Sequence, residues 1–196
     1  MTVQSRQLVL ASTSRYRKAL LERLGLAFDI ASPGVDETVL PNETPADTAL
    51  RLAASKARAV EPRFSDALII GSDQVAAMGS ERFGKPGNHE AALRQLRALS
   101  GKAVDFHTAV SLLDARSGIV ESRLVPCRVF FRPLDERRIE SYLRREQPYD
   151  CSASAKAEGL GIALIARIET DDPSSLIGLP LIAVTELLER AGLRVL

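Results

Sequence analysis

The apolar residues of this chain form two kinds of pattern, and one of them, the continuous run, predicts short buried strands. Apolar runs at Gln7–Ala11 and Ala67–Ile70 each have the length of a strand. The second run is apolar at every position, which is typical of a strand covered on both faces of a sheet. Gly71 and Ser72 follow it and are expected to end the strand, so Asp73 is predicted at its carboxyl end.

Apolar residues spaced three or four apart predict helices. The first follows Ser12–Ser14, which is expected to cap it, and its predicted core face is Ala19, Leu20, Leu21 and Leu24. Thr44 and Pro45 are typical of a helix start. The further helices are predicted over Pro45–Val60, about Asn88–Leu99, about Asp135–Glu146 and Leu181–Ala191.

Further strands are predicted near Phe28, at Val104–Leu113, at Ile119–Phe131 and at Ala163–Ile168. The two long strands are separated by a turn that contains Gly118 and therefore predict a hairpin. Helices and strands interleave around this hairpin, which indicates an α/β fold with a mixed sheet. No repeat or linker divides the chain, so residues 1–196 are expected to form a single domain.

Composition narrows the function classes. The net charge is +1, and the apolar and charged fractions of 45% and 26% are ordinary for a soluble protein, so neither a nucleic-acid polymer nor a membrane is expected as a partner. No apolar run approaches the ~20 residues that cross a bilayer. Cys127 and Cys151 lack metal-ligand spacing and are expected to be reduced thiols of a cytoplasmic protein. His89 and His107 are far apart and are expected to be structural or exposed.

The segment Ser12–Lys18 combines three hydroxyls and three cations at a strand-to-helix junction. Unpaired backbone N–H groups at a helix start attract anions, and arginine matches phosphate geometry. Phosphate binding is therefore the functional interpretation. The alternative is a capped helix with a solvated basic face, but capping does not explain the density of positive charge.

Two single residues are candidates for chemistry. Lys56 falls on or beside the buried face of its predicted helix, where an ammonium is rarely found without a partner. The alternative is that its stem packs while its head reaches water. Asp73 is placed to hold a carboxylate beside a substrate or metal, but a turn aspartate that accepts from backbone donors fits the same pattern.

Three motifs are weak when taken alone. Gly84–Pro86 holds Lys85 between turn-forming residues, and Val35–Glu37 carries an acidic pair. Small residues dominate Ser152–Gly161, where Glu158 stands beside glycines. That segment predicts either close approach of a ligand or a flexible surface loop.

Taken together, these motifs resemble the Maf family of nucleoside triphosphate pyrophosphatases. They occur in the family's order and at family-like spacings. The resemblance implies a Maf/ITPase-like α/β fold, in which helices flank an elongated mixed sheet and a cleft separates two lobes. It also implies hydrolysis of a nucleoside triphosphate to the monophosphate and pyrophosphate with Mg²⁺ or Mn²⁺, and it raises a homodimer as an expectation. The matching residues are Leu10–Ser14, Val35–Glu37, Lys56, Gly71–Gln74, Gly84–Pro86 and Glu158–Gly161.

The resemblance also implies roles for individual residues. Asp73 would act as general base or metal-assisted orienter of the attacking water, and Glu37 would bind the cation or orient the polar network. Ser12 would hold the triphosphate. The cations that would stabilise charge on the phosphate oxygens are Arg17, Lys56 and Lys85.

Base choice is associated in the family with the positions of Tyr16, Gln74 and Glu158. Gly71–Gln74 and Glu158 look most like the 7-methyl-GTP pyrophosphatase branch. Tyr16 would stack on the cationic base, and Glu158 would accept hydrogen bonds from guanine. Many members of that branch have tryptophan at the position of Tyr16.

There are further departures from the family pattern. Members usually have proline at the position of Arg15, which should alter the helix entry, and many have arginine at the position of Lys18. Two other functions stay open at this point. One is a pyrophosphatase for dTTP and UTP, and the other is a non-catalytic nucleotide-binding regulator of cell division.

Overall fold

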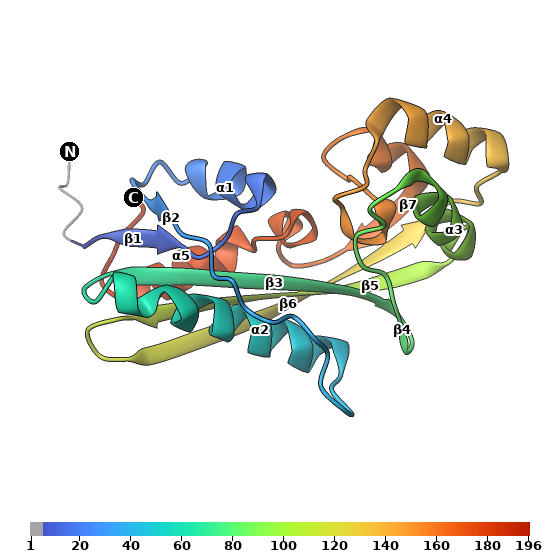
Figure 1. The fold of residues 1–196 in the computed structure, drawn as a ribbon. Coiled ribbons are helices and arrows are strands. Elements are labelled where there is room, and N and C mark those ends of the chain that lie inside the picture. Colours follow the sequence, from blue (N-terminus) through green and yellow to red (C-terminus); the bar gives the residue numbers. More distant parts are fainter. Residues whose placement is uncertain (1–5) are drawn as a thin grey trace. The chain divides into compact units, whose positions relative to one another are not determined.

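The computed structural model describes residues 6–196, and these form a mixed α/β fold (Figure 1). The strands are β1 (Leu8–Leu10), β2 (Asp29–Ile30), β3 (Leu68–Met78), β4 (Glu81–Arg82), β5 (Ala103–Asp114), β6 (Ile119–Phe131) and β7 (Ile165–Glu169). The helices are α1 (Arg15–Glu22), α2 (Pro45–Val60), α3 (His89–Leu99), α4 (Glu136–Glu146) and α5 (Leu181–Arg190). Short 3₁₀ turns are η1 (Glu61–Arg63), η2 (Ser152–Ser154), η3 (Leu160–Leu164) and η4 (Pro173–Ile177).

Seven strands of residues 6–196 pair in the order β2-β1-β3-β5-β6-β7, with β4 also beside β3. β1 is parallel to both β2 and β3, whereas β3 pairs with β4 and β6 pairs with β7 in antiparallel fashion. The prediction of a mixed sheet is therefore confirmed. Within the same residues, no helix combines the length and the apolar composition that crossing a bilayer requires.

The chain divides into two compact units, which are described separately below. The first unit consists of the chain up to Gln74, Thr108–Val125 and Asp172–Leu196. The second consists of Val75–His107 and Pro126–Asp171. Strands β3, β5 and β6 each contribute residues to both units.

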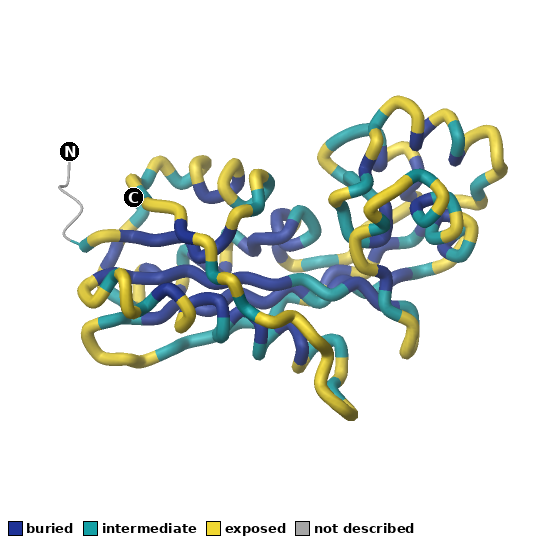
Figure 2. The backbone as a smooth tube through the Cα atoms, in the orientation of Figure 1, coloured by how far each residue is buried: buried dark blue, intermediate teal, exposed yellow. Residues whose placement is uncertain are grey.

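Both faces of the sheet in the first unit are covered. Leu8 and Leu10 of β1 pack in one cluster with α1 and α5, while Val9 packs on the opposite face with Ala57 of α2. This alternation follows from the two-residue period of a strand. β1 and the neighbouring part of β3 are dark blue in Figure 2, as the uninterrupted apolar sequence Ala67–Ile70 predicts.

Most predicted helix bounds agree with the structure, and a capping side chain begins four of the helices. The side chains of Ser14, Thr44, Asn88 and Asp135 each accept a hydrogen bond from a backbone N–H in the first turn of α1, α2, α3 and α4. The prediction that Ala19 lies on the core face of α1 was wrong. Ala19 is exposed, and Leu20 and Leu21 form the buried face.

The end of the strand after Ile70 was also predicted wrongly. β3 continues through Gly71 and Ser72 to Met78, so Asp73 lies within a strand and not in a turn. Gly71 serves a different purpose, because a Cβ atom there would lie 2.1 Å from the carbonyl oxygen of Ala53 in α2. The glycine allows the helix to pack closely against the strand.

Candidate active site

The centre of the first unit's polar cluster is the buried ammonium of Lys56. Its Nζ donates to Oδ1 of Asp73 at 2.6 Å and lies 2.6 Å from Oε1 of Glu37. The Lys56 and Asp73 side chains are 6% and 10% exposed, whereas Glu37 is 59% exposed. The prediction that Lys56 lies on the buried face is confirmed, and its partners are two carboxylates.

Close helix-to-strand packing produces this contact. Lys56 lies between Ala53 and Ala57 along α2, and these are the two residues whose backbones face Gly71. Asp73 is two residues after Gly71 on β3 and therefore points to the same side of the sheet. Because Gly71, Ala53 and Ala57 are small, α2 and β3 pack closely enough for the Lys56 ammonium to reach the Asp73 carboxylate.

The carboxyl group of Asp73 is unusual in its acidity. Burial raises its pKa above the ordinary value, and the nearby Glu37 acts in the same direction. The charges of Lys56 and Arg17 and the hydrogen bond from Lys56 oppose this effect without cancelling it. A carboxylate with a raised pKa is better suited to accept a proton than an ordinary surface aspartate.

The start of α1 supplies a second cation to the cluster. The Oγ of Ser14 accepts from the backbone N–H of Arg17 at 3.4 Å, and Ser12 Oγ accepts from the N–H of Ser14 at 3.2 Å. Burial lowers the pKa of Arg17, and the charges of Asp73 and Glu37 act in the opposite direction. The capping interpretation of Ser14 is confirmed, while Ser12 is buried beneath the guanidinium of Arg17, whose Nη1 lies 3.5 Å from the serine oxygen.

The carbonyl of Gly178 fixes the side chain of Arg17. It accepts from Arg17 Nε at 2.9 Å and from Ser72 Oγ at 3.0 Å. Gly178 follows η4 with a φ of 119°, a conformation that side-chain-bearing residues rarely adopt. The turn therefore presents one backbone oxygen to two residues of the cluster.

Gln74 holds the same turn from the sheet. Its Nε2 donates to the carbonyls of Ser175 and Leu176 at 2.9 and 3.1 Å and to Thr108 Oγ1 at 2.9 Å. The amide nitrogen of this predicted base-selecting residue is therefore engaged within the first unit. Its observed contacts position η4.

Asp172 was missed by the sequence analysis, although it stabilises this turn. Its Oδ1 accepts from the N–H and Oγ of Ser174 at 3.0 and 2.5 Å, and its Oδ2 accepts from the N–H of Ile182 at 2.8 Å. The carboxylate thus caps η4 and the start of α5 together. An aspartate immediately before Pro173 is a recognisable helix-start signal that could have identified it.

The ring of Tyr16 contacts the guanidinium of Arg15. The guanidinium carbon of Arg15 lies 4.8 Å from the ring centroid, and Arg15 Nη2 donates to the tyrosine oxygen at 2.7 Å. The aromatic face is therefore in use for a cation–π contact. This is the kind of interaction that the sequence predicts for a cationic base.

Lys85 and Glu158 belong to the second unit and are both exposed there. The segment around Glu158 makes close contacts within the second unit. Glu146 Oε2 accepts from the N–H of Leu160 at 2.6 Å, and Gly161 packs so closely that a Cβ atom would lie 2.4 Å from the Lys156 carbonyl oxygen. Glu158 is therefore carried on an anchored segment.

The expected structural role of His89 is supported by its contacts in the second unit. Its Nδ1 lies 3.1 Å from the Tyr149 hydroxyl, and its Nε2 lies 3.0 Å from Oε1 of Glu140. Neither Cys127 nor Cys151 forms a disulfide within residues 6–196. Burial raises the pKa of the Cys127 thiol to about 11.

A divalent cation would have to share the carboxylates of Glu37 and Asp73. Within residues 6–196, no group of three or more His, Cys, Asp or Glu side chains could hold a metal ion by itself. Mg²⁺ is commonly bound by one or two carboxylates together with substrate phosphates. The two carboxylates of the first unit fit that donor chemistry.

Comparisons with known proteins show which family the chain belongs to. A 7-methyl-GTP pyrophosphatase of Thiobacillus denitrificans is 56% identical over 196 residues, which cover 100% of this chain and 98% of that protein. A protein of the same name from Aromatoleum aromaticum is 56% identical over 187 residues, covering 95% and 96%. One from Burkholderia pseudomallei is 54% identical over 189 residues, covering 95% and 88%.

A solved HAM1 protein from Coxiella burnetii aligns with a TM-score of 0.39 at 14% identity, covering 81% of this chain and 98% of that one. The sequence comparisons carry the assignment. The family model described as Maf-like protein matches residues 7–191, which include every residue of the polar cluster described above. The chain belongs to the Maf-like protein family.

Proposed function

We propose that this chain is a nucleoside triphosphate pyrophosphatase that hydrolyses 7-methyl-GTP to 7-methyl-GMP and pyrophosphate. The observation that carries the chemistry is the pairing of Asp73, a buried carboxylate of raised pKa, with Lys56 at 2.6 Å. The choice of nucleotide rests on relatives of that name, which are 54–56% identical over nearly the whole chain.

In the proposed reaction, water attacks the α-phosphorus, and the bond from that phosphorus to the bridging oxygen breaks. Asp73 orients the water and accepts its proton. Lys56 and Arg17 stabilise the negative charge on the phosphate oxygens, and Ser12 holds the triphosphate at the start of α1. Lys85 adds a further cation to the phosphates.

Glu37 is the residue that would hold Mg²⁺ or Mn²⁺, with Asp73 beside it orienting the water. When bound, the cation neutralises charge on the phosphate oxygens. Without a cation, the carboxylates of Glu37 and Asp73 would repel a triphosphate, and this repulsion disfavours a pure nucleotide-binding regulator. Dependence of turnover on added Mg²⁺ or Mn²⁺, with loss on chelation, tests this role.

We also propose that the base is selected by Tyr16, Gln74 and Glu158. The enzyme is further proposed to work in the cytoplasm and to form a homodimer. The two reduced thiols are consistent with a reducing compartment. Light scattering after size-exclusion chromatography measures the oligomeric state. A monomeric mass at micromolar concentration would contradict the dimer.

The test of the function is pyrophosphate release from 7-methyl-GTP, GTP, dTTP, UTP and CTP with Mg²⁺ or Mn²⁺. We expect the highest kcat/KM for 7-methyl-GTP. Preference for dTTP and UTP would keep the chemistry and overturn the base assignment. Binding without turnover of any nucleotide would instead support the regulator.

A matched pair of variants tests the stacking role of Tyr16. Because a cation–π contact is worth about 0.5–1 kcal/mol, Tyr16→Ala should raise the KM for 7-methyl-GTP roughly two- to fivefold more than the KM for GTP. Tyr16→Phe keeps the ring and should behave like the wild type. Equal effects of Tyr16→Ala on both nucleotides would contradict stacking.

A further inference from the structure

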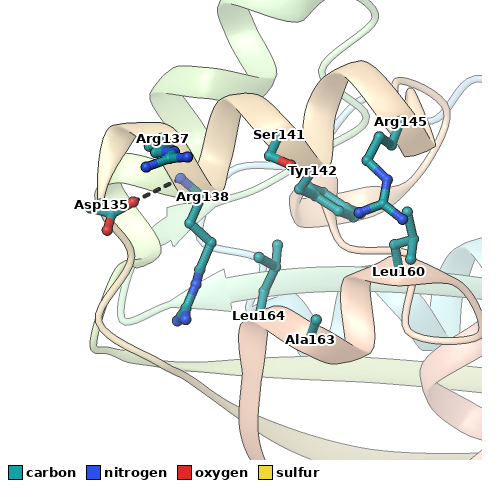
Figure 3. A pocket seen from close by; sticks show the side chains of 9 residues that line it. All are labelled: Asp135, Arg137, Arg138, Ser141, Tyr142, Arg145, Leu160, Ala163 and Leu164. Atoms are coloured by element: carbon teal, nitrogen blue, oxygen red, sulfur yellow. Dashed lines mark hydrogen bonds between the residues drawn. The ribbon is translucent and has the colours of Figure 1, made fainter.

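The second unit contains a pocket between α4 and η3 with a volume of about 420 Å³. Figure 3 shows Leu164 and Ala163 on the η3 side, opposite the helix, with Leu160 at one end. This volume lies within the range of roughly 300–1,000 Å³ that is common for small-molecule sites. None of the lining residues has a role in the proposed nucleotide chemistry.

Three guanidinium groups border this apolar surface. Arg137, Arg138 and Arg145 all line the pocket and are exposed. Among residues 6–196, their side chains form no hydrogen bond or ion pair, whereas Arg144 on the same helix pairs with Glu140 at 3.1 Å. The pocket therefore has donors that the protein itself does not satisfy.

The acidic residues of α4 are committed elsewhere in the second unit. Glu136 pairs with Arg97 at 2.6 Å, Glu140 contacts His89, and Glu146 pairs with Lys156 at 2.6 Å. Asp135 lines the pocket, but its Oδ1 accepts from the backbone N–H of Arg138 at 2.7 Å, the contact drawn in Figure 3. Asp135 offsets one of the three guanidinium charges at the pocket, so the lining residues keep a net positive charge.

The arginines are also spaced along the pocket. Arg138 and Arg145 are seven residues apart on α4, so they lie on the same side of the helix, separated by about 10.5 Å along its axis. Figure 3 shows both side chains reaching from the helix toward η3, Arg145 at the Leu160 end and Arg138 beyond Leu164. Each guanidinium can bind a carboxylate or phosphate through two N–H groups.

We propose that this pocket binds a small organic dianion, with an acidic group at each end of an apolar body. Arg138 and Arg145 bind the two acidic groups, and Leu160 and Leu164 contact the body between them. A pocket of about 420 Å³ has the volume of a small-molecule site, whereas an acidic peptide would need a longer groove. Ser141, exposed between the two arginines, can supply a further hydrogen bond.

The probes are α,ω-dicarboxylates of increasing length, from succinate to sebacate, titrated into the ¹⁵N-labelled full chain and followed by two-dimensional NMR. We expect affinity to rise with chain length, and we expect the shifted amides to fall within residues 135–146 and 160–164. The monocarboxylate decanoate should bind at least fivefold more weakly than sebacate. Equal binding of the two would overturn the two-ended site.

Variants separate the charges from the shape of the pocket. The double variant Arg138→Gln/Arg145→Gln should weaken sebacate binding at least tenfold. Arg144→Gln, on the same helix but already paired, should change it less than twofold. Ala163→Phe keeps the arginines and fills the pocket, so it should also weaken binding at least tenfold.

Three outcomes would contradict the proposal. The first is the absence of chemical-shift changes in the wild type at 10 mM sebacate, and the second is unchanged affinity in the double variant with a native spectrum. The third is an acidic peptide that shifts the same amides and binds more than tenfold tighter than sebacate. That last result would make the surface a protein-docking site.

Discussion

Two lysine–carboxylate pairs in this protein have the same separation and opposite electrostatic character. Lys56 contacts Asp73 in the first unit at 2.6 Å, and Lys156 contacts Glu146 in the second unit at 2.6 Å. Burial raises the pKa of Asp73, whereas the hydrogen bond from Lys156 and the N–H of Leu160 lower the pKa of Glu146. The difference shows that distance alone does not identify a functional pair.

The remaining hydrogen-bond partners explain the difference. Glu146 receives a backbone N–H in addition to the ammonium, so its charge is stabilised in place. Among residues 6–196, Lys56 is the hydrogen-bond donor to Asp73, and Glu37 adds a second negative charge to the same ammonium. In the proposed mechanism the first pair accepts a proton, whereas the second pair anchors a loop.

The largest expected effect is that of Asp73→Asn on turnover. Loss of a general base costs about 10²–10⁴-fold, so kcat for 7-methyl-GTP should fall by about that factor. The unfolding free energy should also fall, by up to about 3–5 kcal/mol, because the variant removes a carboxylate that pairs with the buried ammonium of Lys56. Pyrophosphate release and urea unfolding measure the two quantities.

Glu146→Gln is the matched control for that variant. It should leave kcat for 7-methyl-GTP within about threefold, because it alters a loop contact and no proposed proton acceptor. Near-normal turnover of Asp73→Asn would remove Asp73 from its catalytic role. A loss of 10²-fold or more in Glu146→Gln would remove the distinction between the two pairs.

The next effect concerns the glycines beside the two pairs. Gly71→Ala should cost about 1–3 kcal/mol of stability and most of the activity, because the new methyl group would displace the helix that carries Lys56. Gly159→Ala would meet the carboxylate of Glu146, with the added Cβ 2.6 Å from Oε2. That variant should lose stability while retaining turnover. Thermal unfolding and a kcat measurement on both variants test the contrast.

Glu146→Gln should itself lower the unfolding free energy by about 1–3 kcal/mol at pH 7, because it weakens a charge-assisted contact to a partly buried lysine. Since folding lowers the pKa of Glu146, its contribution is complete above the unfolded value near 4.5 and is lost as the pH falls through the folded value. The stability gap between variant and wild type should therefore narrow below pH 4.5. A gap that is constant from pH 7 to pH 3 would contradict this role.

The smallest expected effect is a shift in the pH dependence of kcat/KM in the variant Lys56→Met. The value of kcat/KM should fall at low pH as Asp73 becomes protonated. The midpoint of this fall should lie at a higher pH than the ordinary pKa of aspartate, because burial raises the pKa of Asp73. Lys56→Met removes the positive charge that opposes the shift, so the midpoint should move to higher pH. A midpoint that moves to lower pH in Lys56→Met would show that another group controls the profile.

The sequence was informative wherever a local rule determined the structure. Thr44 and Pro45 set the start of α2, and the positions of Ala53 and Ala57 identified the buried side of Lys56. It misled at Gly71, because a glycine required by a neighbouring helix looks the same in a sequence as a glycine that ends a strand. The distinction depends on a contact with Ala53 of α2, which a local pattern around Gly71 does not contain.

The loop contacts of the second unit were also beyond the sequence analysis. Glu146 was visible only as the end of a helix, and its pairing with Lys156 depends on how the later segment folds back. Ala153 and Ser154 are buried there with φ values of 56° and 55°. No local pattern favours such conformations for these residues, so tertiary contacts determine them.

The contact between Arg17 and Gly178 links residues that are 161 positions apart in the chain. At typical translation rates, roughly 10–30 s pass between the synthesis of the two residues. Until Gly178 has been made, a growing chain lacks the carbonyl that orients this arginine. If Arg17 binds phosphate as proposed, nascent fragments that end before Gly178 are inactive, and activity begins with the completed polypeptide.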